Sequence, residues 1–144
     1  MTTLDKIRKV SEQFYSGLSR MANGERGAVA DSWSHSATVT TMHPTGGRQV
    51  GWEAVGDSFN RVGEVASDGT VDLNDQRIEV IGDMAYELGI EQGQFKLGGH
   101  PVSFEHRVTN IYRREDGEWK MVHHHADMSP AMQDVLGRLE APTA

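Results

Sequence analysis

Hydrophobic residues recur at three- and four-residue steps through most of the first 21 positions, which predicts an amphipathic helix. Thr3 is the expected N-cap, and Asn23-Gly24 is a stop signal after the last turn. A short second helix is expected from Glu25 to Asp31. The apolar face of the first helix consists of Leu4, Ile7, Phe14, Leu18 and Met21.

The hydrophobic pattern changes to alternation after residue 36. Alternating β-branched residues predict a strand from Ala37 to His43, which Pro44 ends before a turn at Gly46-Gly47. A further helix opens at Gly51. Its apolar positions, again at helical spacing, are Trp52, Val55, Phe59 and Val62.

The chain from Asp68 onward has the pattern of an antiparallel meander. Two-residue turns are expected at Gly82-Asp83, Gly98-Gly99 and Asp116-Gly117, and the last is the strongest short hairpin signal. A final helix is expected from Pro130 to Leu139, before a frayed Ala-Pro-Thr-Ala tail. Helices at one end of an antiparallel sheet predict an α+β fold. The length of 144 residues predicts a single domain spanning 1–144.

The Asp116-Gly117 turn predicts which side chains of the last two strands share a face. With a two-residue loop, Asn110 faces His123, and His124 points to the opposite side. A single bulge would reverse this arrangement. The shared face suits a ligand pocket, and it also suits a core with satisfied polar groups. Its members are Val108, Asn110, Tyr112, Met121, His123 and His125.

Composition and charge narrow the choice of partners and compartment. The net charge is −7, so the chain repels nucleic acid phosphates and anionic membranes, and neither is an expected partner. The absence of cysteine excludes disulfides and cysteine nucleophiles and suits a reducing cytosol. No signal-peptide core or membrane-length apolar stretch is present, so we expect a soluble cytoplasmic protein.

Three passages resemble the nuclear transport factor 2-like superfamily, and within it the SnoaL-like stand-alone proteins. They are the helix with Phe14 and Tyr15, "ATVTTMHPTGGRQVGWEAV" and "RVTNIYRREDGEWKMVHHH". Ketosteroid isomerase, polyketide cyclases and the calcium/calmodulin-dependent kinase II association domain are similar. The resemblance implies a cone-shaped, curved antiparallel sheet wrapped around N-terminal helices, with an open conical pocket. It also implies a homodimer formed through the outer sheet face.

The resemblance to ketosteroid isomerase transfers three site positions. His43, immediately before Pro44, is at the place of its general base. Asn110 is at the place of its protonated carboxylic acid, and Tyr15 is comparable to its oxyanion tyrosine. Because histidine and an amide replace two acidic groups, steroid isomerisation itself is not implied.

The expected catalytic residues are His43, His123 and Asn110. An imidazole titrates near neutrality and can take a proton at physiological pH. The alternative for His43 is an ordinary histidine hydrogen-bonded at a strand end. The expected substrate contacts are Tyr15, Trp33, Val108, Tyr112, Met121 and His125.

Two other interpretations concern metals and acidic residues. His123 and His125 could bind a metal if His106 or His43 supplied a further ligand, but we expect them to line a pocket and expect no metal site. No phosphate-cradling glycine motif is present, so no organic cofactor is expected. Glu87 and Glu91 share a strand face and are interpreted as solvated charges.

Two classes of function stay open. One is an enzyme of the isomerase, cyclase, dehydratase or hydratase type, which would use histidine acid/base chemistry on a hydrophobic carbonyl compound. The other is a non-catalytic ligand-binding or dimeric assembly module. A hydrophobic small molecule is the expected ligand, and a homodimer is the expected assembly.

Overall fold

The computed structural model describes residues 1–140 and contains three α-helices and six strands. A short 3-10 helix, η1, precedes the first strand. The elements in chain order are α1 (Thr3–Met21), η1 (Ala30–Ser32), β1 (Thr40–His43), β2 (Gly46–Val50), α2 (Trp52–Val65), β3 (Ala66–Ile81), β4 (Met84–Leu97), β5 (His100–Glu115), β6 (Glu118–Ala126) and α3 (Pro130–Glu140).

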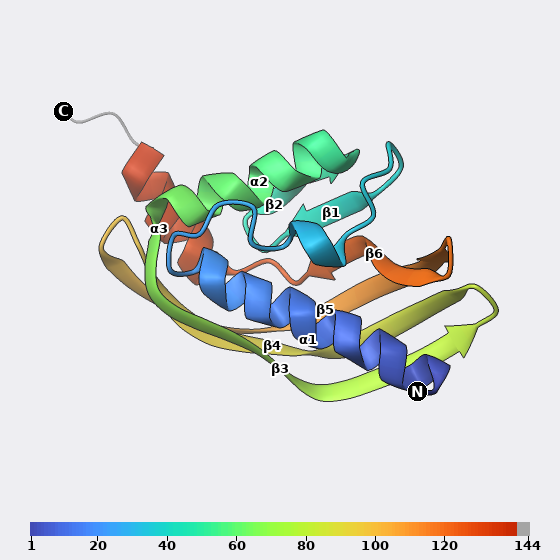
Figure 1. The fold of residues 1–144 in the computed structure, drawn as a ribbon. Helices are drawn as coiled ribbons and strands as arrows, with labels where there is room; N and C mark the ends of the chain where they lie inside the picture. The colour runs from blue at the N-terminus through green and yellow to red at the C-terminus, as the bar shows by residue number, and fades with distance from the viewer. Residues whose placement is uncertain (141–144) are drawn as a thin grey trace.

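The strands form one curved sheet in the order β2-β1-β6-β5-β4-β3. All neighbours are antiparallel except β1 and β6, which run parallel. The sheet curves beneath α1, while α2 lies over the β1–β2 side and α3 lies at the end away from the N-terminus (Figure 1). The predicted α+β class with a curved sheet around N-terminal helices is confirmed.

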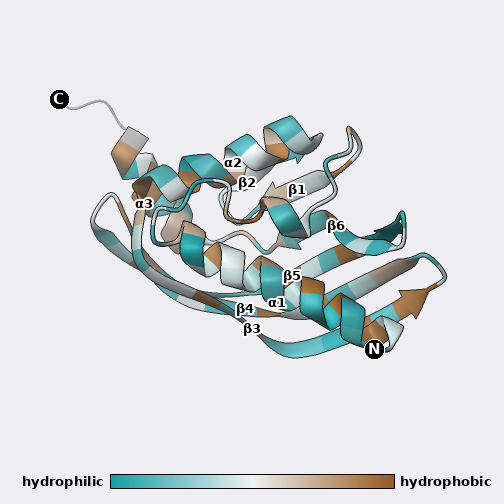
Figure 2. Cartoon of the chain, in the orientation of Figure 1, coloured by the Kyte–Doolittle hydropathy of each residue, from teal (hydrophilic) through white to brown (hydrophobic). Residues whose placement is uncertain are grey.

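The α1 helix forms because its apolar positions gather on one face and its first turn is capped. Figure 2 shows hydrophobic and hydrophilic residues alternating along it. Ile7, Phe14 and Leu18 are buried against the sheet. The cap is Thr2 rather than the predicted Thr3: its hydroxyl accepts from Asp5 N–H, and the Asp5 carboxylate accepts from Thr2 N–H. This reciprocal pair is a capping box.

The three predicted hairpin turns are confirmed, because each pairs the two residues that flank its predicted loop. Ile81 pairs with Met84, Leu97 with His100, and Glu115 with Glu118. Asp116 and Gly117 have φ angles of 52° and 80°. Positive φ at both central residues is what a type I′ turn requires.

Two further local predictions are wrong. The predicted helix from Glu25 to Asp31 is instead a turn segment followed by the start of η1, since Gly27 has a φ of 72° that breaks the helical path. Gly46 begins β2 instead of making a turn with Gly47, because the chain reverses at Pro44-Thr45 and Gly46 pairs with His43. The Ala-Pro-Thr-Ala tail lies outside the described residues.

A bulge in β6 reverses the predicted orientation of the histidine triplet. Tyr112 pairs with Met121 as expected, but Ile111 pairs with His123, so Val122 is an extra residue on β6. Asn110 therefore pairs with His124. The prediction that His123 and His125 share the face of Asn110 is wrong: His124 points inward, and they point outward.

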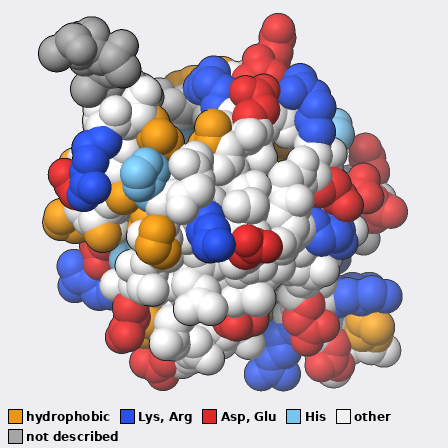
Figure 3. Space-filling model, turned by 90° about the vertical axis from the view of Figure 1, so that its left-hand side faces the viewer, with side chains coloured by type: hydrophobic (Ala, Val, Ile, Leu, Met, Phe, Trp, Pro, Cys, Tyr) orange, Lys and Arg blue, Asp and Glu red, His pale blue; other side chains and the backbone are white. Residues whose placement is uncertain are grey.

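The surface seen in Figure 3 mixes acidic and basic side chains without a large area of one sign. Among the described surface ion pairs are Arg107–Asp127 and Lys96–Asp68. No helix within residues 1–140 is long and apolar enough to cross a membrane.

Candidate active site

Two rows of side chains cross the inner face of the sheet and place buried polar groups side by side. In the first row, Glu87 on β4 pairs with Asn110 on β5, which pairs with His124 on β6. In the second row, Leu73 on β3 pairs with Glu91 on β4, which pairs with His106 on β5. The exposed fraction of every polar member is 6% or less, so these groups are removed from solvent.

The first row is a satisfied hydrogen-bond network centred on the Glu87 carboxylate. The side-chain amide of Asn110 and the hydroxyl of Tyr112 donate to Oε1 at 2.9 and 2.7 Å. The side-chain amide of Gln76 donates to Oε2 at 2.7 Å. Because each oxygen has a donor, the network holds Asn110 in one orientation.

This orientation of Asn110 determines which nitrogen of His124 carries a proton. The Asn110 amide nitrogen also donates to the Tyr15 hydroxyl at 3.2 Å, so its oxygen must face His124. That oxygen lies 2.6 Å from Nδ1 of His124, which must therefore be the donor. Burial lowers the pKa of His124, an effect that the nearby carboxylate of Glu91 opposes.

The second row, in contrast, contains polar atoms without partners. Oε2 of Glu91 and both ring nitrogens of His106 make no hydrogen bond with any residue that the structure describes. Nε2 of His106 is 3.8 Å from Oε1 of Glu91, and Nε2 of His124 is 3.7 Å from Oε2. Buried polar groups are rarely left in this state, because each one lacking a partner costs roughly 1–3 kcal/mol. This second row is therefore where the site can accept a further group.

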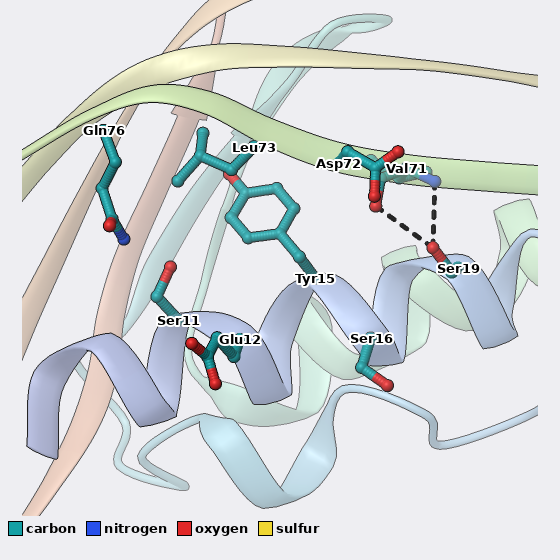
Figure 4. A pocket seen from close by; sticks show the side chains of 9 residues that line it. All are labelled: Ser11, Glu12, Tyr15, Ser16, Ser19, Val71, Asp72, Leu73 and Gln76. Atoms are coloured by element: carbon teal, nitrogen blue, oxygen red, sulfur yellow. Dashed lines mark hydrogen bonds between the residues drawn. The ribbon is translucent and has the colours of Figure 1, made fainter. Parts of the chain in front are cut away.

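An open cleft of about 430 Å³ lies between α1 and β3. Its lining includes Tyr15 and Gln76, which hydrogen-bond to the first row, and Leu73 of the second row. Figure 4 shows the Tyr15 ring extending from α1 toward Leu73 on β3. One side of the cleft is held by Ser19, whose hydroxyl contacts both backbone groups of Val71. Its lining residues are Ser11, Glu12, Tyr15, Ser16, Ser19, Val71, Asp72, Leu73 and Gln76.

Tyr15 connects the cleft with the buried polar groups. Its hydroxyl accepts from Asn110 and donates to no residue that the structure describes. Burial raises the pKa of Tyr15 well above its ordinary value, and the negative charge of Glu91 raises it further. Tyr15 therefore keeps its proton near neutral pH and presents a hydrogen-bond donor.

The structure separates His43 from this group, although it also lies on the inner side. Its Nε2 is 2.7 Å from the Ser58 hydroxyl, and its ring packs edge-on against Phe59. Burial lowers the pKa of His43 to about 3, so the imidazole is neutral at physiological pH. It does not line the α1–β3 cleft. These features fit the hydrogen-bonded strand-end alternative.

His123 and His125 lie on the outer face, away from the cleft. Nδ1 of His123 is 2.6 Å from the Thr40 hydroxyl. His125 is exposed and lines a separate groove of about 500 Å³ with residues of β3, β4 and β5. Their predicted roles in an inner pocket therefore lose their geometric basis. Among residues 1–140, no three His, Cys, Asp or Glu side chains are arranged to hold a metal ion.

The remaining expected contacts are buried in different parts of the interior. Tyr112 belongs to the Glu87 network, and Tyr15 and Asn110 meet as the family resemblance implied. Trp33 packs edge-on against Phe14 in an aromatic cluster, so it is core. Val108 and Met121 are buried and are absent from the lining of the cleft.

Sequence reasoning missed Glu87 and Glu91, which are buried rather than solvated. The Gly98-Gly99 turn contained the missing signal. A two-residue loop there places Glu91 opposite His106 and Glu87 opposite Asn110, in a strand face otherwise made of small and apolar residues. A carboxylate opposite a polar side chain on such a face indicates a buried pair.

Comparison with solved structures defines the class of fold. A nuclear transport factor 2-like superfamily protein from Salmonella enterica has a TM-score of 0.77 at 16% identity, covering 86% of this chain and 89% of that chain. A proposed dehydratase of this superfamily from Streptomyces avermitilis has a TM-score of 0.75 at 21% identity, covering 89% and 97%. A proposed ketosteroid isomerase from Shewanella frigidimarina has a TM-score of 0.66 at 20% identity, covering 83% and 92%. The fold is thus nuclear transport factor 2-like.

The family within that class follows from the sequence. The SnoaL-like domain family matches residues 7–132, which include all six strands and nearly all of α1. The chain belongs to this family. No protein with curated function matches it.

Proposed function

We propose that the protein binds a small hydrophobic carbonyl compound in the α1–β3 cleft and catalyses a proton transfer on it, as an isomerase or dehydratase. The observation that carries the proposal is the Tyr15 hydroxyl. It stands between an open cleft and two buried carboxylates, it retains its proton, and no described residue accepts that proton. A carbonyl oxygen is a suitable acceptor for it.

Tyr15 would stabilise the charge that develops on the carbonyl oxygen. When a proton leaves the neighbouring carbon, negative charge moves to this oxygen, and a fixed donor in a water-poor site stabilises it. Asn110 has a different task from the one expected. Its amide protons already serve Glu87 and Tyr15, so it positions the Tyr15 hydroxyl instead of touching the substrate.

Two of the structural neighbours support this class of reaction. One is named as a proposed dehydratase and the other as a proposed ketosteroid isomerase. These names match the two reaction types proposed for this chain. At about 20% identity the likeness extends to the fold, so the chemistry proposed for this chain depends on its own Tyr15 and carboxylates.

We also propose that the protein forms a homodimer through the β3–β4 hairpin side of the sheet. Val80, Ile81, Met84 and Leu88 are exposed there, and Ile81 is 66% exposed. Clustered exposed apolar side chains mark interaction surfaces more often than isolated ones do.

Light scattering should give twice the monomer mass, and Ile81→Lys should lower it toward the monomer. A wild-type monomer at high protein concentration would exclude this dimer.

The pocket is tested by a thermal-shift screen with hydrophobic enones, lactones, aromatic acids and phenols, including 2-naphthol. A ligand at about a hundred times its dissociation constant adds roughly 2.7 kcal/mol, which raises the Tm by on the order of 10 °C in a domain of this size. A hit that is turned over supports an enzyme. A hit that stays unchanged supports the ligand-binding alternative, and a sharp transition with no shift in the whole panel would contradict the pocket.

A further inference from the structure

We propose that Glu91 is the carboxylate that accepts the proton in this site, and that its substrate carries an acidic C–H bond beside a carbonyl group. The proposal rests on the function proposed above and assigns its base. Glu91 takes the role expected for His43. The Nε2 atom of His43 contacts the Ser58 hydroxyl, and its side chain does not line the α1–β3 cleft.

Glu91 differs from the other carboxylates near the cleft in both burial and partners. Glu87 is also buried, but three donors occupy its two oxygens. Glu12 and Asp72 line the cleft and are exposed to solvent. Glu91 is 6% exposed, and its Oε2 has no hydrogen-bond partner among the described residues. Glu91 is therefore a buried carboxylate beside the cleft with an oxygen that no described residue occupies.

The position of Glu91 places it one side chain behind the wall of the cleft. Its cross-strand neighbour on β3 is Leu73, which lines the cleft. Gly89, two residues before Glu91, leaves room for the Leu73 side chain, since a Cβ there would lie 2.5 Å from Leu73 Cδ1. The Leu73 side chain thus separates the cleft from Glu91, and the proposal requires it to move aside when a molecule binds at Tyr15.

His124 gives the accepted proton a place to go. Because Nδ1 of His124 donates to Asn110, it is Nε2 that faces Oε2 of Glu91, at 3.7 Å. In this tautomer Nε2 carries a lone pair and no proton. It can therefore take over a proton that Glu91 has accepted from the substrate.

The step needs no further reactant. The C–H bond next to the carbonyl breaks, an oxygen of Glu91 forms a new O–H bond, and the electron pair moves through the new C=C bond to the carbonyl oxygen. The Tyr15 O–H donates to this enolate oxygen. Return of the proton to the same carbon gives exchange with solvent, and its delivery to the γ-carbon of a β,γ-unsaturated ketone gives the conjugated isomer.

The test uses 2-tetralone, a hydrophobic ketone with acidic C–H bonds, and 2-naphthol, which has the shape of its enol. Exchange of the tetralone α-protons in D₂O is followed by NMR for wild type, Glu91→Gln and Glu105→Gln. Glu105 is the matched control, because it is an exposed glutamate of the neighbouring strand β5 and does not line the cleft. We expect Glu91→Gln to lose about 100-fold or more of the protein-catalysed exchange and Glu105→Gln to stay within about twofold, while both bind 2-naphthol.

The outcomes separate the two proposals. Failure of wild type to bind 2-naphthol or any compound of the screen would contradict the pocket itself. Binding without accelerated exchange, or equal exchange in wild type and Glu91→Gln, would overturn the role of Glu91 and leave the pocket standing. If Glu91→Gln does not fold, Glu91→Asp replaces it: a folded variant with about tenfold slower exchange supports the assignment, and unchanged exchange overturns it.

Discussion

Asn110 and His124 are cross-strand neighbours, and Oδ1 of Asn110 lies 2.6 Å from Nδ1 of His124. Strand pairing therefore determines which nitrogen of this buried imidazole carries the proton. The amide is held by Glu87 and Tyr15, so its oxygen can only accept, and the histidine must donate through Nδ1. The residue that orders the network therefore also selects the tautomer.

Asn110→Ala should destabilise the protein and remove the contact that fixes the tautomer of His124. His124 loses its acceptor and Glu87 loses a donor in the interior, which should reduce the free energy of unfolding by about 2–4 kcal/mol. Urea unfolding measures this loss, and ¹⁵N NMR of the imidazole rings should show His124 no longer confined to the Nδ1–H form. Thr109→Ala, the neighbouring outward-facing residue, is the control and should change stability by less than about 1 kcal/mol.

Tyr15→Phe should weaken ligand binding more than it weakens the fold. The hydroxyl accepts a single bond from Asn110, which keeps its second acceptor on Glu87, so the cost to stability should be about 1 kcal/mol. Binding of 2-naphthol should fall by at least about tenfold, as expected when a donor to an oxygen with anionic character is removed. Isothermal titration gives the affinity; equal affinity in the two proteins would remove Tyr15 from the binding site.

His43 should make the protein less stable in mild acid. Its pKa is about 3 in the folded protein and about 6.5 in the unfolded chain, so between these values only the unfolded state binds the proton. Stability from this residue is therefore complete above about pH 7.5 and falls as the pH decreases, by up to about 2 kcal/mol at pH 5.

The measurement for His43 is urea unfolding of wild type and His43→Gln at pH 7.5 and pH 5. The stability difference between them should shrink by up to about 2 kcal/mol at the lower pH, because glutamine does not titrate. His100→Gln, at an exposed hairpin histidine, should show no such change. If the stability difference between wild type and His43→Gln is the same at both pH values, folding does not lower the pKa of His43, and its ring is solvated.

Gly93→Ala should be strongly unfavourable. A Cβ at this position would lie 2.2 Å from the backbone oxygen of Thr70 and 2.9 Å from the Phe104 ring, so the sheet must shift to admit it. The expected loss is about 1–3 kcal/mol. Gly137→Ala is the matched control, because a Cβ there meets nothing within 4 Å in helix α3 and should add about 0.5–1 kcal/mol. Thermal unfolding of both variants tests the pair.

The sequence predicts the parts of this fold that depend on local chemistry. The turns at Gly82-Asp83, Gly98-Gly99 and Asp116-Gly117 are predictable, because two-residue loops need residues that adopt positive φ, and glycine and aspartate do so readily. The meeting of Tyr15 with Asn110 was expected only from the family resemblance. It connects residues 95 positions apart, and hydrophobic spacing alone does not position a helix to that accuracy.

The site escaped prediction for two physical reasons. The bulge at Val122 has no compositional signal, because valine fits a regular strand as well as a bulged one. The burial of Glu91 depends on Leu73 and His106, which flank it from strands 18 and 15 residues away in sequence. A charged residue on an alternating strand is usually solvated, and only the combined register of two hairpins shows that this one is not.

The extra residue at Val122 has a consequence for how relatives of this protein should be aligned. With the bulge before the histidine triplet, one imidazole enters the interior; with the bulge after it, the same three letters would send two inward and one outward. The number of residues between the Asp116-Gly117 turn and the triplet does not identify the inward ring. Histidines in the same alignment column can therefore lie on opposite faces of the sheet. Whether a relative has the same site has to be decided from the strand-pairing partners of its histidines, such as Asn110 here, and not from the aligned residue types alone.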